Sequence, residues 1–209
     1  MATDKYEREC WAAGRLLCGI DEAGFGNLFG SLYIAGTVFP KDFDFNLIPG
    51  LNDSKLIKDE KRFALEILIK QYALWWWCEE ITPATIDVET GYYAKYRVSA
   101  EVINSDKNTF DNLHIFMDGN VKIDKVKDCF INDCLVKGDS LVKTISASSI
   151  LAKCAQRRQI MELGPQYPEY KVEKTNGYWS KDQVEAIVKF GPTKWHRLSY
   201  LKNIQWQKN

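Results

Sequence analysis

The stretch GIDEAGFG (residues 19–26) raises the question that the rest of the chain must answer. The apolar run RLLCGI leads into it and predicts a buried strand. Asp21 and Glu22 stand where that strand ends, and Gly24 and Gly26 follow within four residues. The carboxyl ends of strands in open α/β sheets are where active sites collect. A single Asp-Glu pair is nevertheless most often a solvated turn, so its interpretation depends on whether the pattern recurs.

The pattern recurs twice. HIFMDGN (114–120) is an apolar strand followed by Asp118 and a glycine, and DCLVKGDS (133–140) is a looser version that ends on Asp139. Three such strand ends predict that their acids gather at one edge of a sheet. The pattern alone supports a metal site and a set of ordinary turns about equally. Four further acids compete for the last position, but their polar surroundings place them on solvated faces: Asp111, Asp124, Asp128 and Asp133.

Four gathered carboxylates indicate a particular chemistry. Like charges at close range disfavour ionisation, and divalent cations relieve that repulsion. An all-oxygen ligand set suits Mg²⁺ or Mn²⁺. Two such ions about 3.5–4 Å apart hold the attacking and leaving oxygens of a phosphoryl displacement, and no side-chain nucleophile is then needed.

Alternating strands and helices predict an α/β layer fold for the main part of the chain. Apolar periodicity gives strands at 15–21, 31–39 and 75–81, and helices at 3–14, 58–75, 90–106 and 144–163. The last helix has one face of small residues. The segment after it is turn-rich, with three tryptophans and one expected helix at 180–191. We therefore expect a catalytic domain over 1–165 and a small C-terminal helical appendage over 166–209.

Composition limits the function without deciding it. The 209 residues are 45% hydrophobic, and 28 basic residues balance 28 acidic ones, so net charge favours no polyanionic partner. No apolar run approaches the roughly 20 residues of a membrane span, and the charged N-terminus does not resemble a signal peptide. The cysteines lack C-x-x-C spacing. We read them as reduced thiols of a cytoplasmic protein: Cys10, Cys18, Cys78, Cys129, Cys134 and Cys154.

A dinucleotide loop is a rival interpretation of the glycines. GFGNLFG after a strand is close to G-x-G-x-x-G, but Phe29 stands where the third glycine belongs. Asp21 and Glu22 would also repel a pyrophosphate unless a metal intervened. The sequence therefore disfavours this alternative.

Six stretches together resemble the ribonuclease HII family in its bacterial-like form. They are YERECWAAGRLLCGIDEAGFG, GLNDSK, MDGN, VKGDS, ISASSILAK and NGYWSKDQVEAI…GPTKWHRLSY, in order over residues 6–200. The resemblance implies an RNase H-like fold, a mixed five-stranded sheet flanked by helices with a C-terminal helical region. It also implies metal-dependent endonucleolytic cleavage of RNA paired or joined to DNA, leaving 3′-hydroxyl and 5′-phosphate ends. We expect the RNA–DNA hybrid duplex to be the partner, and the protein to be a monomer without a membrane association.

The resemblance assigns the same four acids that the strand ends predict. Asp21 and Asp118 would contact both metals, while Glu22 and Asp139 would each help to position one. The family's Gly-Arg-Gly loop, whose backbone contacts the ribose 2′-hydroxyl, corresponds to Gly24-Phe25-Gly26. Phe25 removes the guanidinium. We therefore expect weaker cleavage at a single embedded ribonucleotide than in long RNA tracts.

The remaining site residues follow from the same resemblance. The tyrosine that packs against the sugar at the RNA–DNA junction corresponds to Tyr178. Phosphate contacts are expected from Asn52, Ser54, Lys55, Lys137, Ser148, Ser149 and Lys153. His196 and Arg197 either touch the DNA strand or are ordinary surface residues. Two other functions stay open: a four-carboxylate 3′–5′ exonuclease, and a hybrid-binding module that has lost activity.

Overall fold

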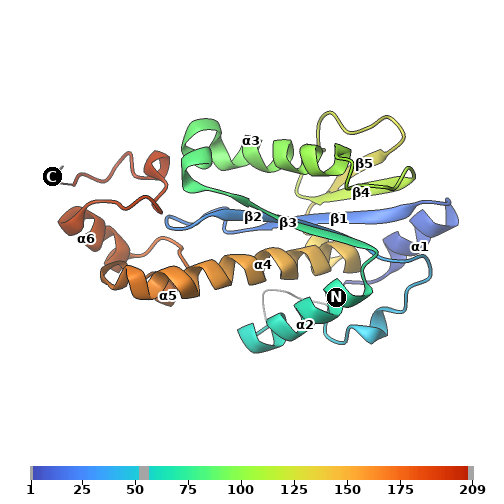
Figure 1. Cartoon of the computed structure of the whole chain (residues 1–209), viewed down its shortest axis with the longest axis horizontal. Coiled ribbons are helices and arrows are strands. Elements are labelled where there is room, and N and C mark those ends of the chain that lie inside the picture. Colours follow the sequence, from blue (N-terminus) through green and yellow to red (C-terminus); the bar gives the residue numbers. More distant parts are fainter. Residues whose placement is uncertain (1, 52–56, 207–209) are drawn as a thin grey trace.

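The computed structural model describes residues 2–51 and 57–206. A five-stranded mixed sheet in the order β3-β2-β1-β4-β5 forms its centre, with helices on both faces (Figure 1). This confirms the predicted fold class. The strands are β1 (Leu16–Ala23), β2 (Leu32–Val38), β3 (Trp75–Ile81), β4 (Leu113–Asp118) and β5 (Ile131–Leu135).

The pairing of the central strands places the first acids side by side. β1 runs antiparallel to β2 and parallel to β4, and Ile20 is paired with Met117. Asp21 and Asp118 are the next residues on these two neighbouring strands. Because β1 and β4 are parallel, both acids lie at the same edge of the sheet. The strand extends to Ala23, so Asp21 and Glu22 lie within β1 and not beyond its end.

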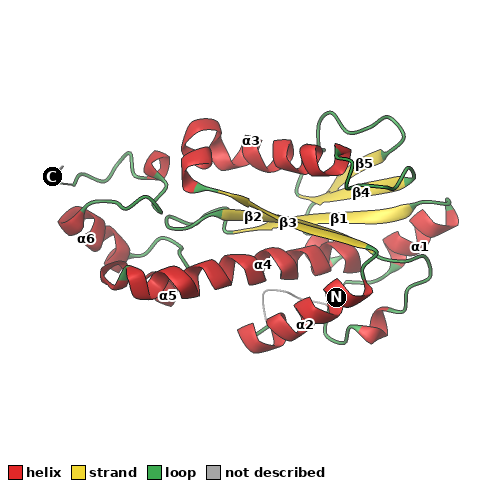
Figure 2. Ribbon diagram, viewed as in Figure 1, coloured by secondary structure: helices red, strands yellow, loops and turns green. Residues whose placement is uncertain are grey.

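Helices cover the two faces of the sheet unequally (Figure 2). One face carries α3 (Pro83–Asn104), and the other carries α1 (Lys5–Ala12), α2 (Asp59–Tyr72) and α4 (Lys143–Leu163). The α4 helix lies very close to β1: a Cβ added to Gly19 would stand 2.6 Å from the backbone nitrogen of Ile145. Buried Ala147 and Ser148 on α4 confirm the predicted small-residue face.

The helix expected at 90–106 begins earlier than its sequence pattern indicated. In the structure α3 starts at Pro83, where the Thr82 side chain accepts a hydrogen bond from the backbone N–H of Thr85. A polar cap followed by proline is a helix-start signal. Thr90 interrupts the helix with φ 67° and ψ 149°. That break hides the periodicity of the first two turns, which explains the difference.

The C-terminal segment packs onto the main part through a shared apolar cluster. It contains α5 (Val172–Thr175) and α6 (Lys181–Phe190), the second of which confirms the helix expected at 180–191. Leu28 and Phe29, from the loop after β1, pack with Tyr170 and Ile187. An isolated bridge also pairs Asn27 with Tyr178. The segment thereby brings Tyr178 to the edge of the sheet where the acids lie.

Two further expectations concern thiols and membranes. All six cysteines are free, as predicted. In the part of the chain that the structure describes, no helix combines the length and apolar character needed to cross a membrane. Trp75 and Trp77 pack into the core on the α3 side, whereas Trp76 stays 40% exposed.

Candidate active site

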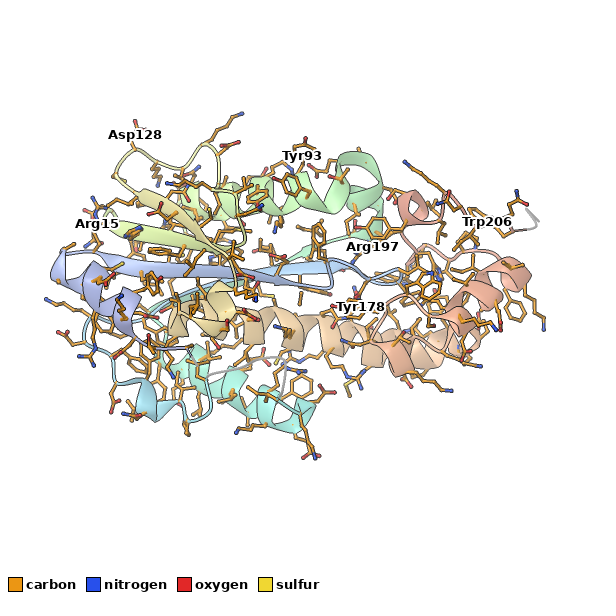
Figure 3. The ribbon with its side chains drawn as sticks, turned by 180° about the vertical axis from the view of Figure 1, so that it is seen from behind. Arg15, Tyr93, Asp128, Tyr178, Arg197 and Trp206 are labelled. Atoms are coloured by element: carbon orange, nitrogen blue, oxygen red, sulfur yellow. The ribbon has the colours of Figure 1, made fainter. Side chains whose placement is uncertain are left out.

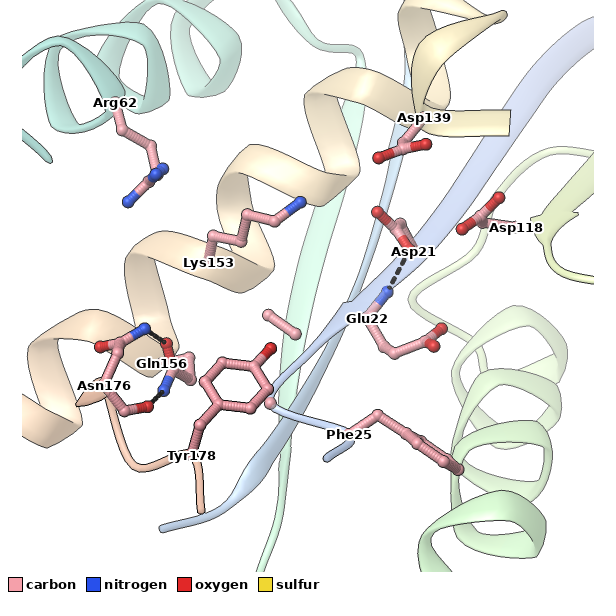
Figure 4. Close-up of a pocket in the computed structure, with 12 residues that line it drawn as sticks. Asp21, Glu22, Phe25, Arg62, Asp118, Asp139, Lys153, Gln156, Asn176 and Tyr178 are labelled. Atoms are coloured by element: carbon pink, nitrogen blue, oxygen red, sulfur yellow. Dashed lines mark hydrogen bonds between the residues drawn. The ribbon is translucent and has the colours of Figure 1, made fainter. Parts of the chain in front are cut away.

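All four predicted acids line one pocket of about 390 Å³ (Figure 4). Asp21 and Glu22 come from β1, Asp118 ends β4, and Asp139 comes from the turn after β5. The sequence pattern expected a third strand to deliver Asp139. Instead, β5 ends at Leu135, and Asp139 lies in a 3₁₀ turn, Gly138–Ser140, that leads into α4.

Burial strongly perturbs the Asp21 carboxyl group in this pocket. Its side chain is buried, and its Oδ1 accepts a 2.8 Å hydrogen bond from the backbone N–H of Glu22. Burial, with a smaller contribution from the charges of Glu22 and Asp118, raises the pKa of Asp21 to about 8. Lys153 and a hydrogen bond from Ser149 act in the opposite direction. Negative charge at this position therefore exceeds what the protein itself balances.

Two lysines approach the acids from opposite faces of the sheet. Lys153 of α4 hydrogen-bonds Ser149, and Figure 4 shows its ammonium directed toward Asp21. Lys95 of α3 lies 3.2 Å from Oε2 of Glu22 and is 6% exposed. The sequence interpretation included Lys153 and missed Lys95. The available signal was a lysine on the apolar face of a helix, between Ala94 and the buried Ser99.

The Gly24-Phe25-Gly26 loop forms the neighbouring rim of the pocket. Gly24 has φ +85°, a conformation that favours glycine. Tyr178 is 49% exposed and faces Gly26, whose added Cβ would lie 3.6 Å from the tyrosine ring. Gln156 and Asn176, both missed by the sequence interpretation, exchange hydrogen bonds of 2.8 and 2.6 Å. These bonds tie α4 to the turn that carries Tyr178.

The prediction that His196 and Arg197 lie at the surface or touch DNA is wrong, because both side chains are buried. The Arg197 guanidinium donates to the backbone oxygens of Gly24, Phe25 and Gly30 at 2.7, 2.7 and 3.1 Å. It therefore supports the loop from inside. His196 packs between aromatic rings, and burial lowers its pKa to about 4.

Ser148 also differs from its expected phosphate contact. It is buried, and its hydroxyl donates to the backbone oxygen of Gly19 at 2.7 Å, which joins α4 to β1. Ser149 is likewise buried, beside Lys153 and Asp21. Lys137 is exposed at the turn before Asp139. Asn52, Ser54 and Lys55 lie outside the described residues.

The competing acids lie away from the pocket. Asp133 binds Nε2 of His114 at 2.9 Å and the Lys122 ammonium at 2.6 Å. Asp111, Asp124 and Asp128 are exposed, and Figure 3 shows Asp128 on a loop far from Tyr178. Their placement on solvated faces agrees with the prediction.

The donor set fits a divalent cation by its chemistry. Four carboxylates offer only oxygen ligands, and a cation would offset the burial and the neighbouring negative charges that raise the pKa of Asp21. Within residues 2–51 and 57–206, no three His, Cys, Asp or Glu side chains are grouped tightly enough to hold an ion as they stand. The carboxylates thus share an open pocket and not a closed coordination sphere.

A mixed sheet of this order, with four acids around its central parallel strands, defines the RNase H-like class of nucleases. The family model described as Ribonuclease HII matches residues 18–208. The chain is 35% identical to Ribonuclease HII of Neisseria meningitidis (88% of this chain and 92% of the relative). It is 38% identical to that of Cupriavidus pinatubonensis (90% and 85%). The chain belongs to the ribonuclease HII family and is an endonuclease of the ribonuclease H type that acts on RNA–DNA hybrids.

Solved structures support the fold. Ribonuclease H2 from Pyrococcus horikoshii OT3 superposes with a TM-score of 0.71 at 22% identity, covering 87% of this chain and 92% of that one. The RNase HII of the Archaeoglobus fulgidus PCNA:RNase HII complex gives 0.70 at 21% identity, covering 92% and 98%.

Proposed function

We propose that this protein hydrolyses the RNA strand of RNA–DNA hybrids and RNA–DNA junctions, leaving 3′-hydroxyl and 5′-phosphate ends. Asp21, Glu22, Asp118 and Asp139 would hold two Mg²⁺ or Mn²⁺ ions. One observation carries the proposal: three separate elements deliver four carboxylates into one pocket. We further propose that residues 166–209 act as the substrate-binding appendage, and that the protein works as a monomer in the cytoplasm.

The roles of the acids follow from their positions. When bound, two divalent ions supply an activated water and neutralise charge on the leaving oxygen. Asp21 and Asp118 are neighbours on paired strands, which supports the proposal that both serve both ions, while Glu22 and Asp139 would each help to position one. The acids must give up any protons that burial makes them retain, because ligating carboxylates are ionised. His196 is buried among aromatic rings and takes no part.

Substrate contacts would come from the rim of the pocket. The backbone of Gly24-Phe25-Gly26 would approach the ribose 2′-hydroxyl, and Tyr178 would pack against the sugar at the junction. Lys153 lines the pocket and Lys137 is exposed two residues before Asp139, which supports phosphate contacts from both. Phe25 offers no phosphate contact. Cleavage at a single ribonucleotide is therefore expected to be weaker than cleavage of a long hybrid, and equal efficiency would contradict this.

The experiment is to map cut sites on a DNA–RNA–DNA strand paired with DNA, in Mg²⁺ and then in Mn²⁺. Internal cuts in the RNA with 3′-hydroxyl ends are expected, unchanged when both ends of the strand are blocked. An Asp139→Asn variant is the matched control and should lose the activity. Dependence on a free end would instead favour the exonuclease. Tight hybrid binding without cleavage in either metal would favour an inactive binding module.

A further inference from the structure

Lys95 places a buried positive charge directly behind the active-site acids. Its ammonium lies 3.2 Å from Oε2 of Glu22, and the residue is only 6% exposed. A buried ammonium is costly unless it is paired and hydrogen-bonded. The contact engages one carboxylate oxygen, so Glu22 retains Oε1 to offer to a ligand in the pocket.

Two aromatic rings enclose the same ammonium. Lys95 Nζ lies 5.5 Å from the ring centroid of Phe25 and 5.1 Å from that of Tyr96, within the range of cation–π attraction. The Phe25 ring packs beside Gly91, one turn earlier on α3: a Cβ there would stand 3.7 Å from Phe25 Cε2, an ordinary van der Waals contact. Figure 4 shows Phe25 and Glu22 both directed toward the green helix, α3.

We propose that Lys95 is a positioning residue: its ammonium fixes the Glu22 carboxylate from the α3 side, and the Phe25 ring covers this ion pair. The inference deepens the proposed function and rests on it. Phe25 lines the pocket, whereas Lys95 lies behind it, so the ring separates the ammonium from substrate and solvent. Glu22, Phe25 and Lys95 then act as one unit.

The unit has a consequence for the residue at position 25. An arginine there would bring a second cation to the space that the partly exposed ring now fills beside the buried Lys95, where like charges repel. A basic residue at 25 and a lysine at 95 therefore disfavour each other. The absence of a guanidinium from the loop is coupled to the presence of an ammonium on α3.

The first test compares Lys95→Met with Lys95→Arg, using Lys107→Met, at an exposed position beyond α3, as the matched control. Removing a cation next to a metal-binding carboxylate strengthens Mn²⁺ binding, by about fivefold in calorimetry without substrate. Loss of the Glu22 anchor lowers kcat at saturating Mn²⁺ by about tenfold or more. Lys95→Arg should retain most of the native kcat. Stronger Mn²⁺ binding together with a lower kcat in Lys95→Met would identify Lys95 as a positioning residue. Weaker Mn²⁺ binding with lower kcat and an unfolding midpoint lowered in parallel would overturn it.

The second test is a double-mutant cycle of Phe25→Arg and Lys95→Met on a long hybrid. Phe25→Arg alone should lower kcat/KM, and the double variant should recover at least about threefold over it, because the repulsion is gone. Strictly additive effects would overturn the coupling. If the native protein cleaves no hybrid, the proposed function fails. The Mn²⁺ titrations of the Lys95 variants still decide whether Lys95 acts on the acids.

Discussion

The backbone N–H of Gly138 donates a 2.6 Å hydrogen bond to Oδ1 of Asp118. This bond joins the end of β4 to the turn that carries Asp139, so two acids from distant parts of the sequence share one pocket. The junction is tightly packed, since a Cβ added to Gly138 would lie 2.7 Å from Cδ1 of Ile145, so a side chain there would displace the end of the Ile145 side chain. The turn, and not a strand end, sets the position of Asp139.

The substitution Asp118→Asn removes the negative charge of this side chain and keeps its shape. The amide oxygen still accepts from Gly138, while the negative charge is lost. Hybrid cleavage should fall by at least about 100-fold, comparable to removing one group that stabilises a transition state. The unfolding midpoint should stay level or rise, because repulsion with Asp21 is relieved. Asp111→Asn, at an exposed acid, is the control and should leave both unchanged. Parental cleavage by Asp118→Asn would rule out its role.

The raised pKa of Asp21 predicts a pH dependence of stability in metal-free protein. Unfolding lowers this pKa from about 8 to the ordinary 3.8. Between these values the folded state holds a proton that the unfolded state releases, so the free energy of unfolding falls as pH rises and levels off above about pH 8. The substitution Asp21→Asn removes this fall in the free energy of unfolding. It should stabilise the protein on the order of 2 kcal/mol at about pH 8 and have little effect near pH 4.

Denaturant unfolding in EDTA at both pH values measures this difference. Comparing the variant with the native protein cancels the contribution of His196, whose lowered pKa acts in the acidic range in both. Mn²⁺ should flatten the pH dependence of the native protein, because a ligand that binds only the folded ionised site offsets the repulsion. A native–variant difference that does not change with pH would contradict the placement of Asp21.

Arg197 predicts a stability effect that also reaches the substrate. Lysine keeps the charge but cannot reproduce the fork that donates to three loop carbonyls. Arg197→Lys should lower the free energy of unfolding by about 3 kcal/mol and raise KM for hybrids, because the loop at 24–26 loses its support. Arg8→Lys tests the same exchange in an exposed ion pair with Asp4 and should change neither quantity. If a folded Arg197→Lys protein has the native KM, the loop at 24–26 keeps its conformation without Arg197.

Local pattern identified the parts of this site that depend on strand register. Parallel strands ending in acids placed Asp21 next to Asp118, as β1 and β4 do. Contacts between elements distant in sequence left no such signal. Arg197 looked like a surface residue because nothing local shows that loop carbonyls surround it. Lys95 was hidden because an ion pair between a helix and the sheet has no sequence period, and the break at Thr90 obscured the helix that carries it.

Gly19 tests the close approach of α4 to the sheet. A methyl group there would meet backbone atoms of Ile145 and Thr144 at 2.6 and 2.7 Å, which cannot rotate away. Gly19→Ala should therefore lower the free energy of unfolding by about 1–3 kcal/mol, as overpacking does. It should also lower cleavage, since α4 carries Lys153. Gly26→Ala is the matched exchange, because its Cβ meets only the Tyr178 ring at 3.6 Å. Urea unfolding measures the free energy of unfolding of both variants. Equal values would mean that α4 is free to move away from β1.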